Sequence, residues 1–257
     1  EKKPLFHFMP GSFSYSIAAP GCNFQCSFCQ NWQISQADDE ALLYGRPYDP
    51  HDIVKTALKN KCKSISYTYT EPTVFFELCQ DTAMIAKQNG LANVFVSNGY
   101  MTSQAIDCAI EWLDAINVDL KSFSDDFYRT NCKARIKPVL DTIKHIANDT
   151  DIWIELTTLL VPGENDDIEQ IKAAADFIVE NVGPDIPWHL SRFFPAYKMD
   201  DQMPLNVDIL QKAFEIASSA GLHYVYVGNL PGNDRESTYC HNCDKKIINR
   251  MSYRICE

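Results

Sequence analysis

Strand and helix patterns alternate about six times along this chain, and this alternation limits its fold more than any other feature. Short runs rich in β-branched and aromatic residues are separated by runs whose apolar residues recur every three or four positions. Such alternation is typical of βαβ units and a parallel sheet, which right-handed crossovers would curl into a full or partial barrel. We therefore expect an α/β protein. Its expected strands are residues 13–19, 64–70, 93–97, 115–120, 152–160, 188–192 and 223–227, and its expected helices 50–61, 73–89, 102–113, 136–148, 168–182 and 206–220. Residues 37–48 show neither pattern and are expected to be irregular.

Three cysteines follow the first expected strand at the spacing C-x3-C-x2-C, as Cys22, Cys26 and Cys29. Three thiolates this close together can hold three corners of a cubane iron–sulfur cluster. Four cysteines would leave no iron open, whereas three leave one iron without a protein ligand. An open position is what separates a catalytic metal site from a structural one. The loop therefore predicts a [4Fe-4S] cluster that can take a further ligand.

Unusual residues also follow the other expected strands. In barrels and open α/β sheets alike, ligands bind at the carboxyl ends of the strands. We therefore expect these residues to line one pocket together with the cysteines. They are Thr70 and Glu71, Ser97 and Asn98, Asp119 and Lys121, Val161, and Arg192.

Charge, apolar runs and cysteine content limit which kinds of partner the chain can bind and which cellular compartment suits it. The net charge is −11 and no Lys/Arg run stands out, which argues against a nucleic acid bound through its phosphates. No apolar run approaches the roughly 20 residues that cross a bilayer, and no leader pattern appears. The chain of 257 residues has ten cysteines, of which five lie in two groups and five are scattered, and the grouped cysteines favour metal over disulfides. We expect a cytoplasmic protein without a nucleic-acid or membrane partner.

The second cysteine group lies near the end of the sequence, at Cys240 and Cys243. The C-x2-C spacing is that of a pair of zinc ligands, so zinc bound there is an expectation of its own, with His241 or Cys256 as candidates for the further ligands. The length suits one large domain with small appendages. The expected divisions are an N-terminal extension over 1–12, the barrel over 13–232, and a tail over 233–257.

The cysteine motif, with aromatic Phe28 just before its last cysteine, resembles the cluster motif of radical S-adenosylmethionine enzymes. "SNGY" at 97–100, "VDLKSF" at 118–123 and "LLVPGENDD" at 159–167 are similar to activating enzymes of glycyl-radical enzymes, such as pyruvate formate-lyase activating enzyme. Over nearly the whole chain the sequence resembles the AmmeMemoRadiSam system radical enzyme family. The segments that carry this likeness are "KKPLFHFMPGS" at 2–12, "GCNFQCSFCQNWQISQ" at 21–36, "YTYTEPT" at 67–73 and "WHLSRFFPAY" at 188–197.

The resemblance implies a partial (β/α)6 barrel and a first chemical step. A reduced [4Fe-4S] cluster passes one electron to S-adenosylmethionine, whose amino and carboxylate groups bind the open iron. The sulfonium breaks and a 5′-deoxyadenosyl radical results, so the expected class is an oxidoreductase. The electron would come from a reductant such as ferredoxin or flavodoxin. The radical chemistry belongs to the cofactor, and the protein supplies position and protection.

Residue roles follow from the strand ends and the resemblance together. The catalytic candidates are Asp119, Lys121 and Arg192. The cofactor-binding candidates are Phe28, Thr70, Glu71, Ser97, Asn98, Lys121, Val161 and Arg192. Each has a simpler alternative: Glu71 could complement a helix dipole, Ser97 and Asn98 could form only a turn, and Arg192 could form a salt bridge at the rim. His189 is as readily a core histidine as a catalytic one.

Three hypotheses about the target remain open at the level of sequence. The first is an activase that abstracts hydrogen from a glycine in a partner protein. The second keeps the radical step but acts on a small molecule or on another protein site. The third is an iron–sulfur electron carrier or zinc-binding module, which predicts a fourth cysteine near the triplet, whereas the next along the chain is Cys62.

Overall fold

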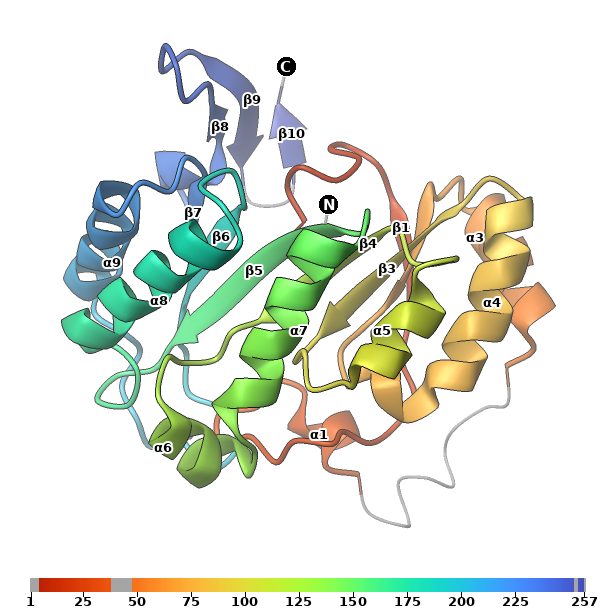
Figure 1. The fold of residues 1–257 in the computed structure, drawn as a ribbon, viewed down its shortest axis with the longest axis horizontal. Helices are drawn as coiled ribbons and strands as arrows, with labels where there is room; N and C mark the ends of the chain where they lie inside the picture. Colours follow the sequence, from red (N-terminus) through yellow and green to blue (C-terminus); the bar gives the residue numbers. More distant parts are fainter. Residues whose placement is uncertain (1–4, 38–47, 252–253, 257) are drawn as a thin grey trace.

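The computed structural model describes residues 5–37, 48–251 and 254–256, and within them seven parallel strands form one sheet (Figure 1). The strands pair in chain order from β1 at one edge to β7 at the other, as an α/β sheet built from consecutive crossovers requires. This confirms the expected partial barrel. The strands are β1 (Ser14–Ile17), β2 (Ser64–Tyr67), β3 (Ala92–Ser97), β4 (Ala115–Asp119), β5 (Trp153–Leu160), β6 (Trp188–Arg192) and β7 (Val225–Gly228).

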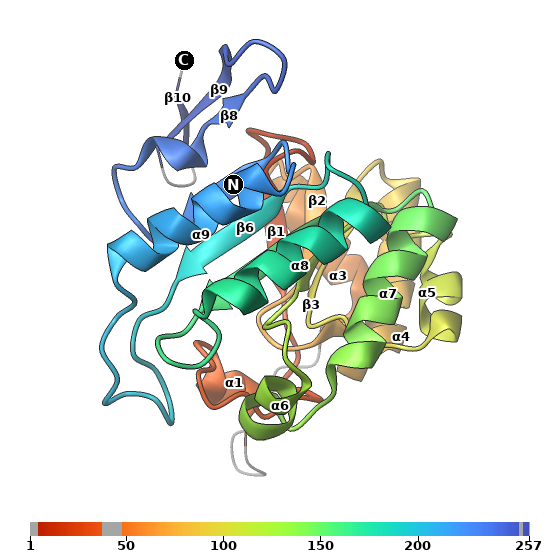
Figure 2. The ribbon, with the colours of Figure 1, turned by 60° about the vertical axis from the view of Figure 1, so that its left-hand side comes forward.

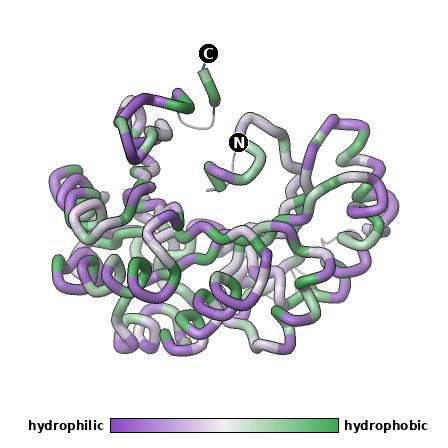
Figure 3. The backbone as a smooth tube through the Cα atoms, turned by 45° about the horizontal axis from the view of Figure 1, so that its top comes forward, coloured by the Kyte–Doolittle hydropathy of each residue, from purple (hydrophilic) through white to green (hydrophobic). Residues whose placement is uncertain are grey.

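Helices cover the outer face of the curved sheet (Figures 1 and 2). Their starts follow local capping signals: Asp49 accepts a hydrogen bond from the His51 N–H at 2.8 Å, with Pro50 as the first helical residue of α3. Hydrophobic and hydrophilic residues alternate along the outer helices, as one buried face requires (Figure 3). The main helices are α3 (Pro50–Lys59), α4 (Phe76–Gln88), α5 (Ser103–Ala109), α7 (Ile136–Asp149), α8 (Ile168–Asn181) and α9 (Val207–Ser219).

Short elements lie at the two ends of the barrel. Near the carboxyl ends of the strands lie α1 (Trp32–Ser35), η1 (Pro72–Phe75), α6 (Asp125–Phe127) and the π-turn η2 (Tyr128–Cys132). Beyond the opposite ends, the tail forms an antiparallel sheet that the sequence analysis did not anticipate (Figure 1). The strands of this sheet are β8 (Thr238–Tyr239), β9 (Lys246–Met251) and β10 (Arg254–Cys256), and the 3-10 turn η3 (Asp234–Glu236) precedes them.

Both ends of the described chain are tied to the barrel by buried bonds. The backbone N–H groups of Phe6 and His7 donate to the Glu155 carboxylate on β5, each at 2.8 Å. Arg250 of β9 donates from Nη2 to the Phe6 carbonyl at 2.7 Å. The division at residues 12 and 232 stays a prediction, because these contacts show attachment and do not define domain limits.

Most strand and helix limits differ from those expected by one to three residues. The helix expected to reach residue 113 ends as α5 at Ala109. The strand β2 ends at Tyr67, before the expected residue 70, because Tyr69 adopts a positive φ of 68° that a strand cannot contain. The helix expected from residue 73 begins as the 3-10 turn η1 before α4. The irregular stretch expected over 37–48 lies almost wholly outside the described residues. No helix among the described residues is long and apolar enough to cross a membrane.

Candidate active site

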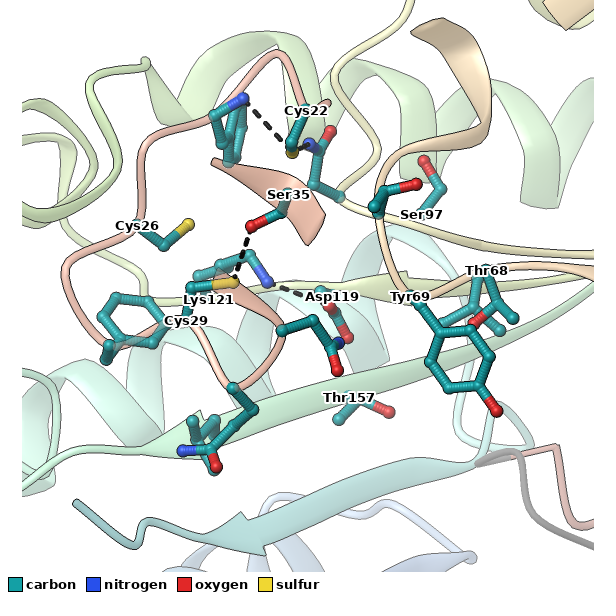
Figure 4. Close-up of a pocket in the computed structure, with 18 residues that line it drawn as sticks. Cys22, Cys26, Cys29, Ser35, Thr68, Tyr69, Ser97, Asp119, Lys121 and Thr157 are labelled. Carbon is teal, nitrogen blue, oxygen red and sulfur yellow. Dashed lines mark hydrogen bonds and ion pairs between the residues drawn. The ribbon is translucent and has the colours of Figure 1, made fainter. Parts of the chain in front are cut away.

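A cavity of about 230 Å³ opens at the carboxyl ends of the strands (Figure 4). Candidate site residues that follow the first four strands line this cavity, as expected from the parallel topology. Its wall includes Cys22, Cys26, Phe28, Cys29, Thr70, Ser97, Asn98, Asp119 and Lys121.

The cysteine loop is braced from behind by η2. The Gln25 N–H donates to the Cys132 carbonyl at 3.0 Å, and the Ser27 N–H donates to the Asn131 carbonyl at 2.9 Å. The Ser27 hydroxyl also donates to Asn131 Oδ1 at 3.0 Å. These long-range contacts fix the loop, so the side chains of Cys22, Cys26 and Cys29 are directed toward one side of the same cavity (Figure 4).

The thiols of this loop suit a soft metal centre. Burial raises the pKa of Cys22 to about 12. A hydrogen bond with the Cys132 thiol, followed by burial, raises the pKa of Cys26, while the Lys121 charge acts in the opposite direction. A metal must therefore displace protons from these sulfurs. Three free thiols on one wall, among them partly buried Cys22 and Cys29, match the donor set that iron–sulfur clusters need.

Asp119 and Lys121 form an ion pair in the wall of the cavity, with Lys121 beside Cys29 (Figure 4). Lys121 Nζ donates to Asp119 Oδ2 at 2.8 Å. Burial alone would lower the pKa of Lys121, but the negative charge of Asp119, which also accepts its hydrogen bond, outweighs burial, so the pKa lies well above its usual value. The Lys121 backbone is held by a hydrogen bond from its N–H to Tyr128 Oη at 3.0 Å. Lys121 is therefore a fixed cation facing the cavity, able to bind an anionic group.

Glu71 does not line the cavity and is instead fully buried behind its wall. Its carboxylate accepts hydrogen bonds from Ser97 Oγ and from the Asn98 N–H, both at 2.8 Å. Thr73 donates from its backbone N–H at 3.2 Å and from its hydroxyl at 3.0 Å. Burial raises the pKa of Glu71, although each of these bonds acts to lower it. In this arrangement Glu71 positions the turn at 97–98.

The turn held by Glu71 reaches the cysteine loop. Asn98 Nδ2 donates to Asn23 Oδ1 at 2.6 Å and lies 3.8 Å from Cys22 Sγ. Gly99 follows with a φ of 71°, and a Cβ there would approach Val118 Cγ1 to 2.7 Å. Only glycine fits both restrictions, which explains why the turn reads Asn-Gly.

Two further candidates, Val161 and Arg192, lie outside the cavity wall. Val161 is fully buried, and its N–H donates to Asn165 Oδ1 at 2.6 Å. Arg192 Nε donates to the Leu205 carbonyl at 2.7 Å, and its guanidinium lies 5.1 Å from the centre of the Phe194 ring. The structure gives neither residue a contact with the cavity, so their cofactor roles stay predictions.

Several wall residues were not identified from the sequence. Ser35, Thr68, Tyr69 and Thr157 all line the cavity. Thr157 pairs in register with Asp119 across β4 and β5, so its side chain faces the same interior. In β5, polar Glu155 and Thr157 alternate with apolar Ile154 and Leu156, a signal that the sequence prediction did not use, and Tyr69 was assigned to a strand that ends before it.

A second compartment of about 410 Å³ adjoins this wall on the side of β6 and β7. Gln30 lines both spaces. His189 and Ser191 face it from β6, and Gly228 faces it from β7. A Cβ at Gly228 would come within 2.9 Å of Ser191 Oγ, so the glycine keeps this space open.

Cys240 and Cys243 lie in the turn between β8 and β9, where backbone N–H bonds from Asn242, with Cys243 close by, lower the pKa of Cys240. Among the described residues, Asp185, His223 and His241 form the only group of three or more side chains whose ligand atoms lie within 4.8 Å of one another, close enough to share a single metal ion. That group does not include the cysteine pair, so zinc at Cys240 and Cys243 gains no support.

Comparisons with known proteins agree with the fold. The profile of the Radical SAM superfamily matches residues 16–178. The chain is similar to the uncharacterized protein MJ0808 of Methanocaldococcus jannaschii, with 44% identity over 253 residues, covering 98% of this chain and 74% of that protein. It is 27% identical over 205 residues to the putative glycyl-radical enzyme activating enzyme MJ1632 of the same organism, covering 77% of this chain and 74% of that protein.

A solved domain of a pyruvate-formate lyase-activating enzyme from Bacteroides vulgatus superimposes with a TM-score of 0.56 at 20% identity, covering 65% of this chain and 99% of that one. At this identity the likeness supports the fold alone.

Proposed function

This chain belongs to the radical SAM superfamily, and on that premise we propose that it cleaves S-adenosylmethionine reductively and uses the resulting 5′-deoxyadenosyl radical to abstract hydrogen from a substrate. Cys22, Cys26 and Cys29 would hold the [4Fe-4S] cluster that the family implies. When bound, the cluster supplies one electron to the sulfonium, which separates into methionine and the radical. The electron comes from a protein reductant such as ferredoxin or flavodoxin, in a reducing compartment such as the cytoplasm.

The observation that carries this proposal is that three thiols, the Lys121 cation and the polar turn at 97–98 all line one cavity. Lys121 would bind the carboxylate of the methionine part of S-adenosylmethionine. Asp119 would hold the Lys121 ammonium group in place. The wall from Thr68 to Thr70 and the turn at Ser97 would receive the amino group. Glu71 would not contact the cofactor itself but would hold the turn that does.

The target would occupy the second compartment, next to the cavity in which the radical forms. A glycyl-radical activase is the finer proposal, supported by the likeness to MJ1632. A small molecule or another protein site is the alternative, and the compartment supports it because its volume of about 410 Å³ accommodates a small ligand.

An electron carrier is the candidate from a different class, and Cys132 is the observation that favours it. This fully buried cysteine hydrogen-bonds with Cys26 but is not part of the cavity wall. A carrier would need it as a fourth ligand. Under our proposal, Cys132→Ser keeps the cluster and the cleavage activity, whereas loss of the cluster in this variant would favour the carrier.

The direct test is anaerobic reconstitution with iron and sulfide, followed by dithionite and S-adenosylmethionine, with 5′-deoxyadenosine measured by mass spectrometry. We expect product from the wild type and none from Cys26→Ala. Cys108→Ala, at an exposed cysteine of α5, is the matched control and should behave as wild type. A wild-type protein with an intact cluster and no product would refute the proposal.

A further inference from the structure

A second group of metal-ligating side chains lies at the end of the barrel opposite the cavity. Asp185 precedes β6, His223 precedes β7, and His241 belongs to the turn between β8 and β9. Their ligand atoms all lie within 4.8 Å of one another. We propose that Asp185, His223 and His241 form a binding site for a divalent cation of the zinc type, which joins the tail to the barrel.

The side chains are close to a ligating arrangement. His223 Nδ1 lies 2.8 Å from Asp185 Oδ1. The His223 and His241 rings are nearly parallel, at 8°, with centroids 4.2 Å apart. Zinc bonds to nitrogen and oxygen of about 2.0–2.2 Å place the ligand atoms of a tetrahedral site about 3.3 Å apart. Rotation about side-chain bonds can supply the difference, because the Asp185 and His223 side chains are 70% and 34% exposed.

The backbone under these side chains is held in place. The His223 N–H donates to the Pro184 carbonyl at 2.9 Å, which fixes the two barrel loops beside each other. In the tail turn, the Cys240 N–H donates to the Lys245 carbonyl at 2.9 Å, and the Asp244 N–H donates to the Cys240 carbonyl at 2.8 Å. The cation would therefore draw together side chains whose main chains already lie near one another.

The donor set determines the class of ion. Two imidazoles and one carboxylate are ligands that zinc accepts, and hard cations such as magnesium prefer oxygen alone. Three protein ligands leave the fourth position for water. The proposal needs no thiolate, so it is separate from the cysteine pair of the same turn.

The consequence is a second anchor for the tail. The base of the tail is already held by Arg250, through its bond to the Phe6 carbonyl, and by Thr238, whose hydroxyl lies 2.8 Å from Tyr226 Oη. His241 lies in the turn at the far end of β8 and β9, where most side chains are exposed. A cation there would hold the turn against the loops before β6 and β7, whether or not the radical chemistry proves correct.

The test uses cluster-reconstituted protein, stripped of loose metal, to which one equivalent of zinc is added. We expect about one zinc per chain after desalting, and X-ray absorption at the zinc edge should show nitrogen and oxygen neighbours at about 2.0–2.2 Å. His241→Ala and Asp185→Asn should each weaken zinc binding by at least about 100-fold. His51→Ala, at an exposed histidine of α3, is the matched control and should bind as wild type.

A second readout follows the tail itself. Zinc should slow tryptic cleavage at Lys245 and Lys246 in the wild type and leave the His241→Ala variant unprotected, with circular dichroism confirming that both are folded. Sulfur neighbours at about 2.3 Å would assign the zinc to cysteine instead and overturn the proposal. Equal zinc affinity in His241→Ala, or no zinc retained by the wild type, would also overturn it.

Discussion

Two carboxylates, Glu71 and Glu155, are fully buried in the same barrel, yet their pKa values move in opposite directions. Each accepts four hydrogen bonds. The donors to Glu71 are hydroxyls and backbone N–H groups, and burial raises its pKa despite them. Burial acts on Glu155 in the same sense, but the His189 ring at 2.7 Å, together with His7, lowers the pKa overall.

The different partners of Glu155 and Glu71 indicate different roles, one in stability and one in shaping the cavity. Glu155 has an imidazole partner and clamps the segment at Phe6 and His7 to the end of the barrel away from the cavity. Glu71 accepts its four hydrogen bonds from uncharged hydroxyl and backbone N–H groups, and it holds the turn at 97–98 that forms part of the cavity wall. We infer that losing Glu155 chiefly costs stability, and that losing Glu71 chiefly costs cleavage of S-adenosylmethionine, as expected for the two ends of such a barrel.

The largest expected effect is that of Glu155→Ala on stability. Removing the carboxylate leaves His189 and the N–H groups of Phe6 and His7 buried without an acceptor. We expect the free energy of unfolding to fall by about 3–5 kcal/mol, measured by urea denaturation. Cleavage activity per folded molecule should stay within about threefold of wild type. Glu77→Ala, at an exposed position of α4, should change neither quantity appreciably.

Glu71→Gln should show the reverse pattern. The new glutamine side chain would have an NH2 group where Glu71 has a carboxylate oxygen. That NH2 group would face the donor of Ser97 or Asn98, and the repulsion between the two donors would displace the turn. A displacement of about 1 Å in a positioned site costs on the order of 100-fold in rate, and we expect such a loss in 5′-deoxyadenosine formation. The free energy of unfolding should fall by only about 1–3 kcal/mol. Unchanged activity would show that the turn does not position the cofactor.

The pH dependence of stability should separate the two residues by sign. Because the folded pKa of Glu155 is lowered, its contribution is present above the unfolded value of about 4.3 and is lost as pH falls through the folded pKa. The folded pKa of Glu71 is raised, so its ionisation reduces stability as pH rises from about 4.3 through the folded pKa. The deficit of Glu155→Gln relative to wild type should therefore grow with rising pH, whereas that of Glu71→Gln should shrink. Denaturation curves across pH 4 to 7 measure both, and parallel curves would contradict the assigned shifts.

The sequence predicted those residues of the site that lie close together in the chain. Cys22, Cys26 and Cys29 share one short loop, and Asp119 and Lys121 follow one strand, so their common placement needed only the parallel topology. Arg192 also ends a strand, but its contact with the Leu205 carbonyl depends on a later loop that no local pattern describes.

Long-range contacts account for what the sequence did not reveal. The brace from Asn131 and Cys132 to the cysteine loop joins segments more than 100 residues apart in the chain. Glu71 was correctly placed at a strand end, but its side-chain direction depends on Ser97 and Asn98, which come from another strand. The pairing of buried Glu155 with His189 is likewise set by packing between two strands.

The smallest expected effect is that of Thr73→Val. This variant removes the hydroxyl that donates to Glu71 but keeps the backbone N–H, so three of the four bonds to the carboxylate remain. We expect a loss of about 1 kcal/mol in the free energy of unfolding and a change in cleavage rate of less than about fivefold. Thr73→Ser keeps the hydroxyl and should restore both. A loss as large as that of Glu71→Gln would mean that Thr73 itself contacts the cofactor.

The most direct test of the central claim is the electron paramagnetic resonance spectrum of the reduced, reconstituted protein with and without S-adenosylmethionine. If Cys22, Cys26 and Cys29 hold a cluster with one open iron, the added molecule binds that iron and the spectrum must change. An intact reduced cluster whose spectrum is identical with and without saturating S-adenosylmethionine would contradict the assignment of an open iron.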